Sequence, residues 1–239
     1  MPLLTLLLAA LIQGITEFLP VSSSGHLILL PQLTGMADQG QIIDVAVHVG
    51  TLFAVIIYFW KDASAALFGL PRALCGKLDT SGAFMALCLI IATIPVVIIG
   101  LILKLTGLDD MMRNITVIGW TMLIVGLVLY WADQTGKTER NADQWTLRHA
   151  LLMGLWQAIS LIPGTSRSGI TISAARRFGY KRADGAKISM LMSIPTIIAS
   201  GVLLGGEVII TADAQVAKDA TIAATLAFFA ALFALSIMM

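Results

Sequence analysis

Charged residues are scarce in this chain. Only 12% of its 239 residues are Asp, Glu, Lys or Arg, whereas soluble domains carry about 25%. Hydrophobic residues make up 58% of the sequence, and the mean hydropathy is +0.91. This balance excludes an ordinary soluble domain and predicts an all-α polytopic membrane protein. The net charge of +1, without a basic low-complexity arm, gives no reason to expect nucleic acid as a partner.

Cysteine is also rare. Cys75 and Cys88 cannot build a disulfide framework, and Cys88 lies in an apolar run, so both are expected to be free thiols. The N-terminus has no basic region before its first apolar run, and no A-x-A-like site closes that run. The first run is therefore expected to be retained as structure rather than cleaved as a signal peptide.

Long apolar runs are abundant, but only some can cross a membrane, because a full crossing needs about 20 mostly apolar residues. Five segments qualify: 42–60, 82–103, 114–131, 185–204 and 220–239. Four others are too short or too broken: 3–19, 25–33, 150–162 and 169–178. These four form two pairs, hinged on P-V-S-S-S-G (20–25) and on P-G-T-S-R-S-G (163–169). Non-helical backbone survives at membrane depth only in protein or beside a watery cavity, so each pair predicts a re-entrant helix–loop–helix hairpin.

A shift of 143 residues brings the two halves into register, with Pro20 on Pro163 and Ser23 on Ser166. The order of short, short, long, long segments agrees between the halves. Three crossings per half is an odd number, so the second copy must be inverted, with a binding site at the repeat interface. We therefore expect one membrane domain of two inverted-topology repeats, at about 1–132 and 147–239. The counterpart of 114–131 would fall near 257–274, so we favour a truncated second repeat without its last crossing.

The basic residues predict the orientation. If the 61–81 loop is cytoplasmic, 133–149 and 176–187 lie on the same side, and together they carry eleven Lys and Arg. These are Lys61, Arg72, Lys77, Lys137, Arg140, Arg148, Arg176, Arg177, Lys181, Arg182 and Lys187. The opposite side has three: Lys104, Arg113 and Lys218. Only Arg167, in the second hinge, is left unassigned.

Polar side chains gather in and around the two hinges: Glu17, Ser22, Ser23, Ser24, His26, Ser166, Arg167, Ser168 and Thr171. A charge at mid-bilayer costs about 2.5–3.5 kcal/mol on insertion scales, so Glu17 and Arg167 are functional candidates. A buried ion pair that only fixes hairpin packing is the plainer alternative. An arginine among hydroxyls and exposed backbone N–H groups suits a phosphate, and the helix starting after Arg167 adds a favourable dipole.

Other readings of these residues are weaker. G-T-S-R-S-G-I-T (164–171) superficially resembles a P-loop, but Ile170 stands where the lysine belongs and no strand precedes it. His48 is expected to pack between helices, and Asp44 has no partner visible in the sequence.

Two stretches together, E-F-L-P-V-S-S-S-G-H from Glu17 and P-G-T-S-R-S-G-I-T from Pro163, resemble a known family. They are similar to the signatures of the undecaprenyl-diphosphate phosphatases, the bacitracin-resistance family of bacterial inner membranes. Those signatures are (E/Q)-x-x-x-E with P-V-S-S-(S/T)-G-H, and P-G-x-S-R-S-x-x-T. Gln13 occupies the first position of the first signature, where glutamine is allowed. The second signature matches at every position from Pro163 to Thr171. The resemblance covers the whole chain, including D-V-A-V-H-V-G-T from Asp44, although family members carry a further C-terminal hydrophobic segment.

The resemblance implies interlocking inverted repeats, a site open toward the periplasm, and hydrolysis of undecaprenyl diphosphate to the monophosphate and phosphate. This reaction recycles the carrier lipid for peptidoglycan and underlies bacitracin resistance. Carried over by position, it implies a central set of Glu17, Ser23, His26 and Arg167. Gln13 would support Glu17, and Ser166 and Thr171 would bind phosphate. The neighbouring hydroxyls of Ser22, Ser24 and Ser168 join the expected phosphate-binding set.

The chemistry leaves alternatives open. Ser23 is favoured as a nucleophile with His26 or Glu17 as its base, but either base could instead activate water while Ser23 binds phosphate. A divalent cation, Mg²⁺ or Ca²⁺, could neutralise charge, although no metal site is evident. A transporter or flippase of a phosphorylated lipid is the alternative function, because inverted repeats with broken helices are transporter architecture. A homodimer is also compatible with the sequence.

Overall fold

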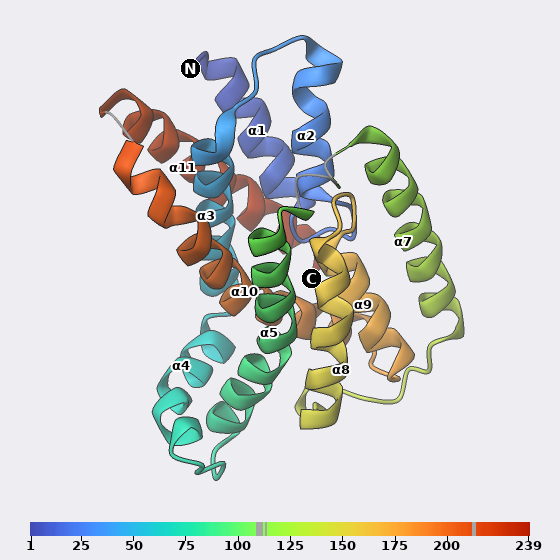
Figure 1. The fold of residues 1–239 in the computed structure, drawn as a ribbon. Helices are drawn as coiled ribbons and strands as arrows, with labels where there is room; N and C mark the ends of the chain where they lie inside the picture. Colours follow the sequence, from blue (N-terminus) through green and yellow to red (C-terminus); the bar gives the residue numbers. More distant parts are fainter. Residues whose placement is uncertain (109–111, 113, 212–213) are drawn as a thin grey trace.

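The structure is a computed structural model that describes residues 1–108, 112, 114–211 and 214–239, with 203–211 described by backbone only. Arg113, counted above for orientation, lies outside the described residues. All regular elements within these ranges are helices (Figure 1). They are α1 (Leu3–Thr16), α2 (Ser23–Thr34), α3 (Gly40–Tyr58), α4 (Trp60–Leu74), α5 (Ser81–Thr106), α7 (Ile115–Thr135), η1 (Ala142–Gln144), α8 (Leu147–Ala158), η2 (Ile159–Leu161), α9 (Arg167–Arg177), α10 (Arg182–Thr211) and α11 (Ala214–Met238).

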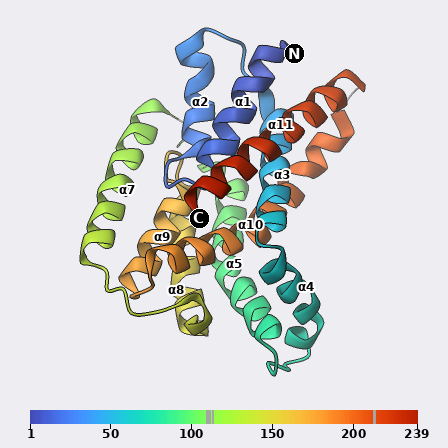
Figure 2. The ribbon, with the colours of Figure 1, turned by 180° about the vertical axis from the view of Figure 1, so that it is seen from behind.

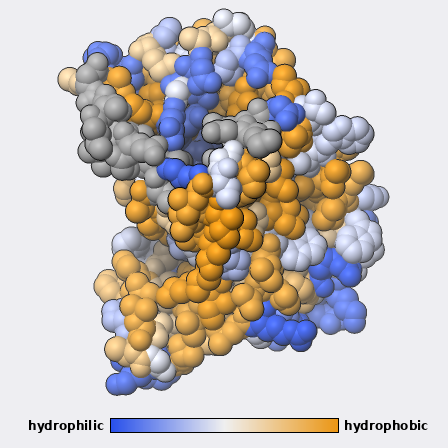
Figure 3. All heavy atoms as spheres, in the orientation of Figure 1, coloured by the Kyte–Doolittle hydropathy of each residue, from blue (hydrophilic) through white to orange (hydrophobic). Residues whose placement is uncertain are grey.

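Five helices are long and apolar enough to cross a membrane, as the sequence predicts. They are α3, α5, α7, α10 from Arg182 to Val202, and α11, with hydropathies between 1.3 and 3.0. On the face shown in Figure 3, apolar residues dominate the middle of the molecule, and hydrophilic residues gather toward its two ends. The prediction of a multi-pass, all-α membrane protein is confirmed.

The four short apolar segments form two helix–turn–helix hairpins, α1–α2 and α8–α9. The two hairpins come from opposite ends of the molecule and their turns meet near its middle (Figures 1 and 2). The turns touch directly, because Ser168 Oγ donates a hydrogen bond of 2.7 Å to the carbonyl of Leu19. Both hinges are therefore brought together, while the two-repeat division of the chain stays a prediction.

Helix α4 was not anticipated, since the sequence analysis treated 61–81 as a loop. Charged residues near both ends of this segment, including Lys61 and Arg72, made it look like a loop in the sequence. In the structure it is a helix that packs along α5 (Figure 1). The packing is close at two glycines. A Cβ at Gly69 would lie 2.4 Å from the backbone of Gly82, and one at Gly82 would lie 2.2 Å from the carbonyl of Ala65.

Arg176 at the far end of α9 is only 1% exposed, although the sequence analysis counted it among the cytoplasmic charges. Its Nε lies 3.1 Å from Asp133 Oδ1, and its Nη atoms donate to the carbonyls of Gly136 at 2.9 Å and Tyr180 at 2.6 Å. These bonds attach α9 to the last turn of α7 and to the residues that follow α7 and α9. They hold in place the helix that carries Arg167.

The α3–α11 contact also depends on a glycine, and its replacement should destabilise the fold. A Cβ at Gly50 would lie 2.1 Å from the carbonyl oxygen of Ala224, which is backbone and cannot move aside cheaply. Small residues at such contacts let membrane helices approach closely. We expect Gly50→Ala to lower the free energy of unfolding by about 1–3 kcal/mol, measured by thermal unfolding in detergent. Gly119→Ala is the control, because a Cβ there meets nothing within 4 Å; equal midpoints for the two variants would contradict the prediction.

Candidate active site

Each hinge contains a serine that caps the helix that follows. Ser22 Oγ accepts a hydrogen bond of 3.1 Å from the Gly25 backbone N–H, and Ser166 Oγ accepts one of 3.1 Å from Gly169. Each cap also bonds the serine two residues on, Ser22 with Ser24 at 3.3 Å and Ser166 with Ser168 at 3.1 Å. The cap bonds satisfy helix N–H groups that would otherwise lack partners.

The matching caps revise the register between the two hinges. Ser22 corresponds to Ser166 at a shift of 144 rather than 143, because the second hinge has one more residue between its proline and its cap. Ser23 then corresponds to Arg167, and each is the first residue of its helix, α2 or α9. The two hinges thus place a hydroxyl and a guanidinium at equivalent positions.

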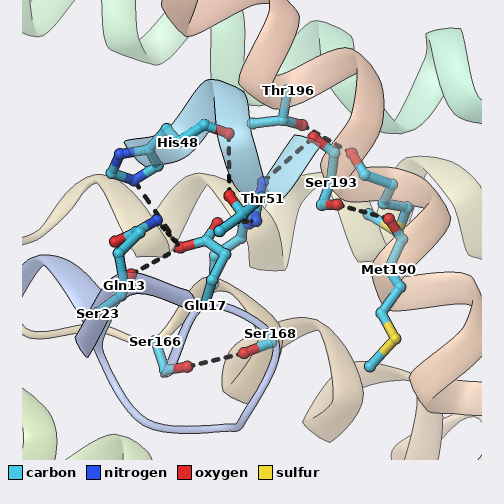
Figure 4. Close-up of polar contacts among 12 residues, drawn as sticks. Gln13, Glu17, Ser23, His48, Thr51, Ser166, Ser168, Met190, Ser193 and Thr196 are labelled. Atoms are coloured by element: carbon cyan, nitrogen blue, oxygen red, sulfur yellow. Dashed lines mark hydrogen bonds and ion pairs between the residues drawn. The ribbon is translucent and has the colours of Figure 1, made fainter. Parts of the chain in front are cut away.

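Glu17, which directly follows α1, joins these two helix starts. Its Oε1 forms an ion pair with Arg167 Nη2, and its Oε2 accepts a hydrogen bond of 2.7 Å from Ser23 Oγ. Gln13 Nε2 donates to the same Oε2 at 2.8 Å (Figure 4). Glu17 is 8% exposed. The carboxylate is therefore buried, charge-compensated and held against a hydroxyl.

Arg167 is held from a second side, since its Nη1 donates at 3.3 Å to the carbonyl of Ser193 on α10. A guanidinium carries five N–H donors, so these two contacts leave donors for an anion. The N-termini of α2 and α9 both lie next to Glu17, and helix N-termini favour negative charge. Two atoms near the hinges, Gln13 Oε1 and Thr165 Oγ1, are buried without a hydrogen-bond partner. Such orphaned atoms point to a place where water or a ligand belongs.

The hydroxyls predicted to bind phosphate lie in different surroundings. Ser24 is exposed, while Ser22, Ser166 and Ser168 are buried and already bonded within or between the hinges. Thr171 is fully buried and bonds Ser189 on α10 at 2.6 Å. In this arrangement these four buried hydroxyls hold the two hinges and α9 in place, and their contact with phosphate stays a prediction.

His26 lies one helical turn after Ser23 and is half-buried. Its Nδ1 is 2.6 Å from the carbonyl of Ser22 four residues earlier, and because a carbonyl only accepts, Nδ1 carries the hydrogen. Its Nε2 is therefore the nitrogen left to exchange a proton. Among the described residues, no hydrogen bond joins the His26 ring to Glu17 or Ser23.

His48 is the site residue that the sequence analysis missed. It was expected to pack between helices, but its Nε2 lies 3.8 Å from Glu17 Oε2 (Figure 4). The available signal was its place in the D-V-A-V-H-V-G-T stretch shared with the family, four residues after Asp44. Asp44 also has a visible partner, since its Oδ1 accepts from Gln39 Nε2 at 2.9 Å.

The side chains around the hinges offer few ligands for a metal ion. No cluster of three or more His, Cys, Asp and Glu side chains able to hold an ion occurs in the described part of the chain. Glu17 contributes one carboxylate, already bonded to Arg167, Ser23 and Gln13. These residues therefore do not fit a resident metal ion.

Comparison with known proteins identifies the family of this chain. The family model described as bacitracin resistance protein BacA matches residues 6–239. An undecaprenyl-diphosphatase of Ruegeria pomeroyi is 68% identical over 239 residues, which is 100% of this chain and 90% of the relative. One from Saccharophagus degradans is 48% identical over 205 residues, covering 86% of this chain and 77% of the relative. Undecaprenyl-diphosphatase 1 of Rhodospirillum rubrum is 42% identical over 245 residues, covering 100% and 86%. The chain belongs to the BacA bacitracin-resistance family.

Proposed function

We propose that this protein hydrolyses undecaprenyl diphosphate to undecaprenyl phosphate and inorganic phosphate, and so recycles the carrier lipid used for peptidoglycan. The main support is that Glu17 contacts both Ser23 and Arg167, which start two helices at the place where the two hairpins meet. The relatives, which are undecaprenyl-diphosphatases by name, support the same activity. They do not support the alternative of a lipid transporter or flippase.

The geometry favours Glu17 as the base for Ser23. With 2.7 Å between Ser23 Oγ and Glu17 Oε2, the carboxylate can take the hydroxyl proton as Oγ attacks the terminal phosphorus. The bond from that phosphorus to the bridging oxygen breaks, and undecaprenyl phosphate leaves. Water then attacks the phosphoserine and releases inorganic phosphate. Phosphoryl transfer depends mainly on positioning and on neutralising oxygen charge, which Arg167 and the two helix N-termini supply.

His26 fits a second proton-transfer step. Its free Nε2 lies on the same helix as Ser23, one turn later, where it can protonate the leaving oxygen or activate the incoming water. Direct attack by water activated by Glu17 or His26, with Ser23 as a phosphate ligand, is the alternative route. The two routes differ in whether a covalent intermediate forms, which is the basis of the first test in the Discussion.

The membrane placement of the site is part of the proposal. The eleven basic residues named above lie on segments at one end of the bundle, and the α1–α2 hairpin enters from the opposite end (Figure 1). We place the basic end in the cytoplasm of a bacterial inner membrane, with the site open toward the periplasm. The lipid tail would then stay in the bilayer while its diphosphate reaches the hinges.

Two further expectations belong to the proposal. A divalent cation, Mg²⁺ or Ca²⁺, would have to be carried by the diphosphate oxygens, since the described side chains form no ligand cluster. A homodimer stays a prediction, which mass measurement of the purified protein in detergent can test.

Replacing the central carboxylate tests the proposal. Glu17→Gln preserves the shape of the side chain but removes its charge and basicity, so phosphate release should fall by about 10²–10⁴-fold. The measurement is phosphate release from undecaprenyl diphosphate by purified protein in detergent. Glu139→Gln is the control, because Glu139 is exposed and its ion-pair partner among the described residues is Lys137, at 3.7 Å. A well-folded parent that binds the lipid but releases no phosphate would instead favour the flippase.

A further inference from the structure

His48 gives Glu17 a second basic neighbour on α3. Its Nε2 is 3.8 Å from Glu17 Oε2, the oxygen that also accepts the hydrogen bond from the Ser23 hydroxyl. Arg167 contacts the other oxygen, Oε1. The carboxylate therefore lies between two basic groups from different helices, and one of them can gain or lose a proton.

The orientation of the His48 ring is defined. Its Nδ1 lies 2.7 Å from the carbonyl of Asp44, so in the neutral ring Nδ1 carries the hydrogen and Nε2, which faces Glu17, does not. Thr51 Oγ1 bonds the His48 carbonyl at 2.9 Å and ties the same turn of α3. The histidine side chain is one-third exposed, at 33%, so water can deliver a proton.

The charge balance of the cluster changes when an anion enters. With His48 neutral, the charges of Glu17 and Arg167 cancel. A diphosphate brings more negative charge and draws the donors of Arg167, leaving Glu17 in need of another cation. His48 is the only other basic side chain paired with Glu17 among the described residues.

Several ionisable groups on the described parts of the helices near α3 have partners other than His48. On α2, His26 bonds the Ser22 carbonyl; Lys187 of α10 and Asp62 of α4 pair with each other at 2.8 Å; and Asp219 of α11 pairs with the terminal amine.

We propose that His48 takes up a proton from solvent as a phosphate anion binds, and then serves as the counter-ion that keeps Glu17 directed at Ser23. This inference rests on the proposed function and makes His48 a positioning residue, not a catalytic one. The proton adds to Nε2 on binding and returns to solvent when phosphate leaves, and no other bond changes. The site thereby couples the arrival of its anion to the alignment of its base.

Calorimetry can measure this proton uptake. Methylene diphosphonate, whose P–C–P bridge resists hydrolysis, is titrated into the full chain in detergent, using buffers with different heats of ionisation. The parent should take up more protons per diphosphonate than His48→Gln, which keeps a hydrogen-bond donor but cannot titrate. His149→Gln should match the parent, because His149 lies outside the site and bonds Tyr180 at 2.8 Å. Equal uptake in the parent and His48→Gln would overturn the proposal.

A kinetic comparison separates positioning from simple packing. His48→Gln should lower kcat about 10-fold to 100-fold and, because proton uptake and anion binding are linked, should also weaken diphosphonate binding. It should also lose the fall in rate that we expect of the parent at high pH. An unchanged pH profile would overturn the inference.

If His48→Gln does not fold, ¹⁵N-histidine spectra of His26→Gln, which retains His48, must show an imidazole gaining a proton with diphosphonate. A parent that binds diphosphonate but does not hydrolyse the lipid would refute the proposed function and leave the proton measurement decisive for His48.

Discussion

Replacing Ser23 with alanine is expected to lower phosphate release by about 10⁶-fold, the scale seen when a nucleophile is removed from a hydrolase. The reason is the covalent route. Ser23 is the first residue of α2, and its Oγ lies 2.7 Å from Glu17 Oε2. Glu17 can therefore take the hydroxyl proton, and the hydroxyl lies at the helix N-terminus, where a phosphate would bind. The measurement is single-turnover release of labelled phosphate from undecaprenyl diphosphate, with acid quenching to trap any phosphoserine.

A second variant makes this test specific. His26→Ala should slow hydrolysis of the intermediate and accumulate labelled protein, whereas Ser23→Ala should never become labelled. Ser193→Ala is the matched serine control, because in the described part of the chain that buried hydroxyl donates to the Met190 carbonyl alone, at 2.6 Å. Normal turnover by Ser23→Ala, with no adduct in His26→Ala, would establish direct attack by water and reduce Ser23 to a phosphate ligand.

Arg167→Ala should lower kcat/KM by about 10³–10⁵-fold, the range for an arginine that stabilises a phosphoryl-transfer transition state. It should also destabilise the protein by about 3–5 kcal/mol, because it leaves the buried Glu17 carboxylate without its ion-pair partner. Arg167→Lys retains the charge but loses the paired donors that reach two phosphate oxygens. We therefore expect the lysine variant to keep most of the stability and little of the activity.

The control for Arg167 is on the same helix. Arg177 lies at the other end of α9, where its guanidinium stacks 4.4 Å from the Trp131 ring centroid. Arg177→Ala should leave kcat/KM within about threefold of the parent, since surface substitutions away from the site perturb little. Parallel loss of stability and activity in Arg167→Lys, or full activity in Arg167→Ala, would show that Arg167 serves hairpin packing alone.

Glu17 and Arg167 show how far sequence reasoning reaches. They are 150 residues apart, yet both were predicted as site residues, because a charge in an apolar segment is costly unless it is paired or used. The hinges were predictable for a similar reason, since Pro, Gly and clustered serines interrupt apolar runs too short to cross. Their meeting in one place then follows from membrane physics, which confines non-helical backbone to protein interiors or cavities.

The register between the hinges needed the structure. Sequence alignment paired Ser23 with Ser166, whereas the caps pair Ser23 with Arg167. Matching letters favoured the serine, but a helix start is defined by which side chain accepts the first free backbone N–H. That acceptor is visible only in the folded chain.

By itself, the sequence determined the helical membrane class, the five crossings, the two hairpins and the central pair Glu17 and Arg167, because apolar run length and the cost of buried charge act locally. Tertiary structure alone decided that α4 packs on α5, that Thr171 turns toward Ser189, and that His48 faces Glu17. The physical reason is the rotation of each helix within the bundle. A helix has the same local pattern whichever neighbour its polar side chain meets, and packing against the other helices selects that neighbour.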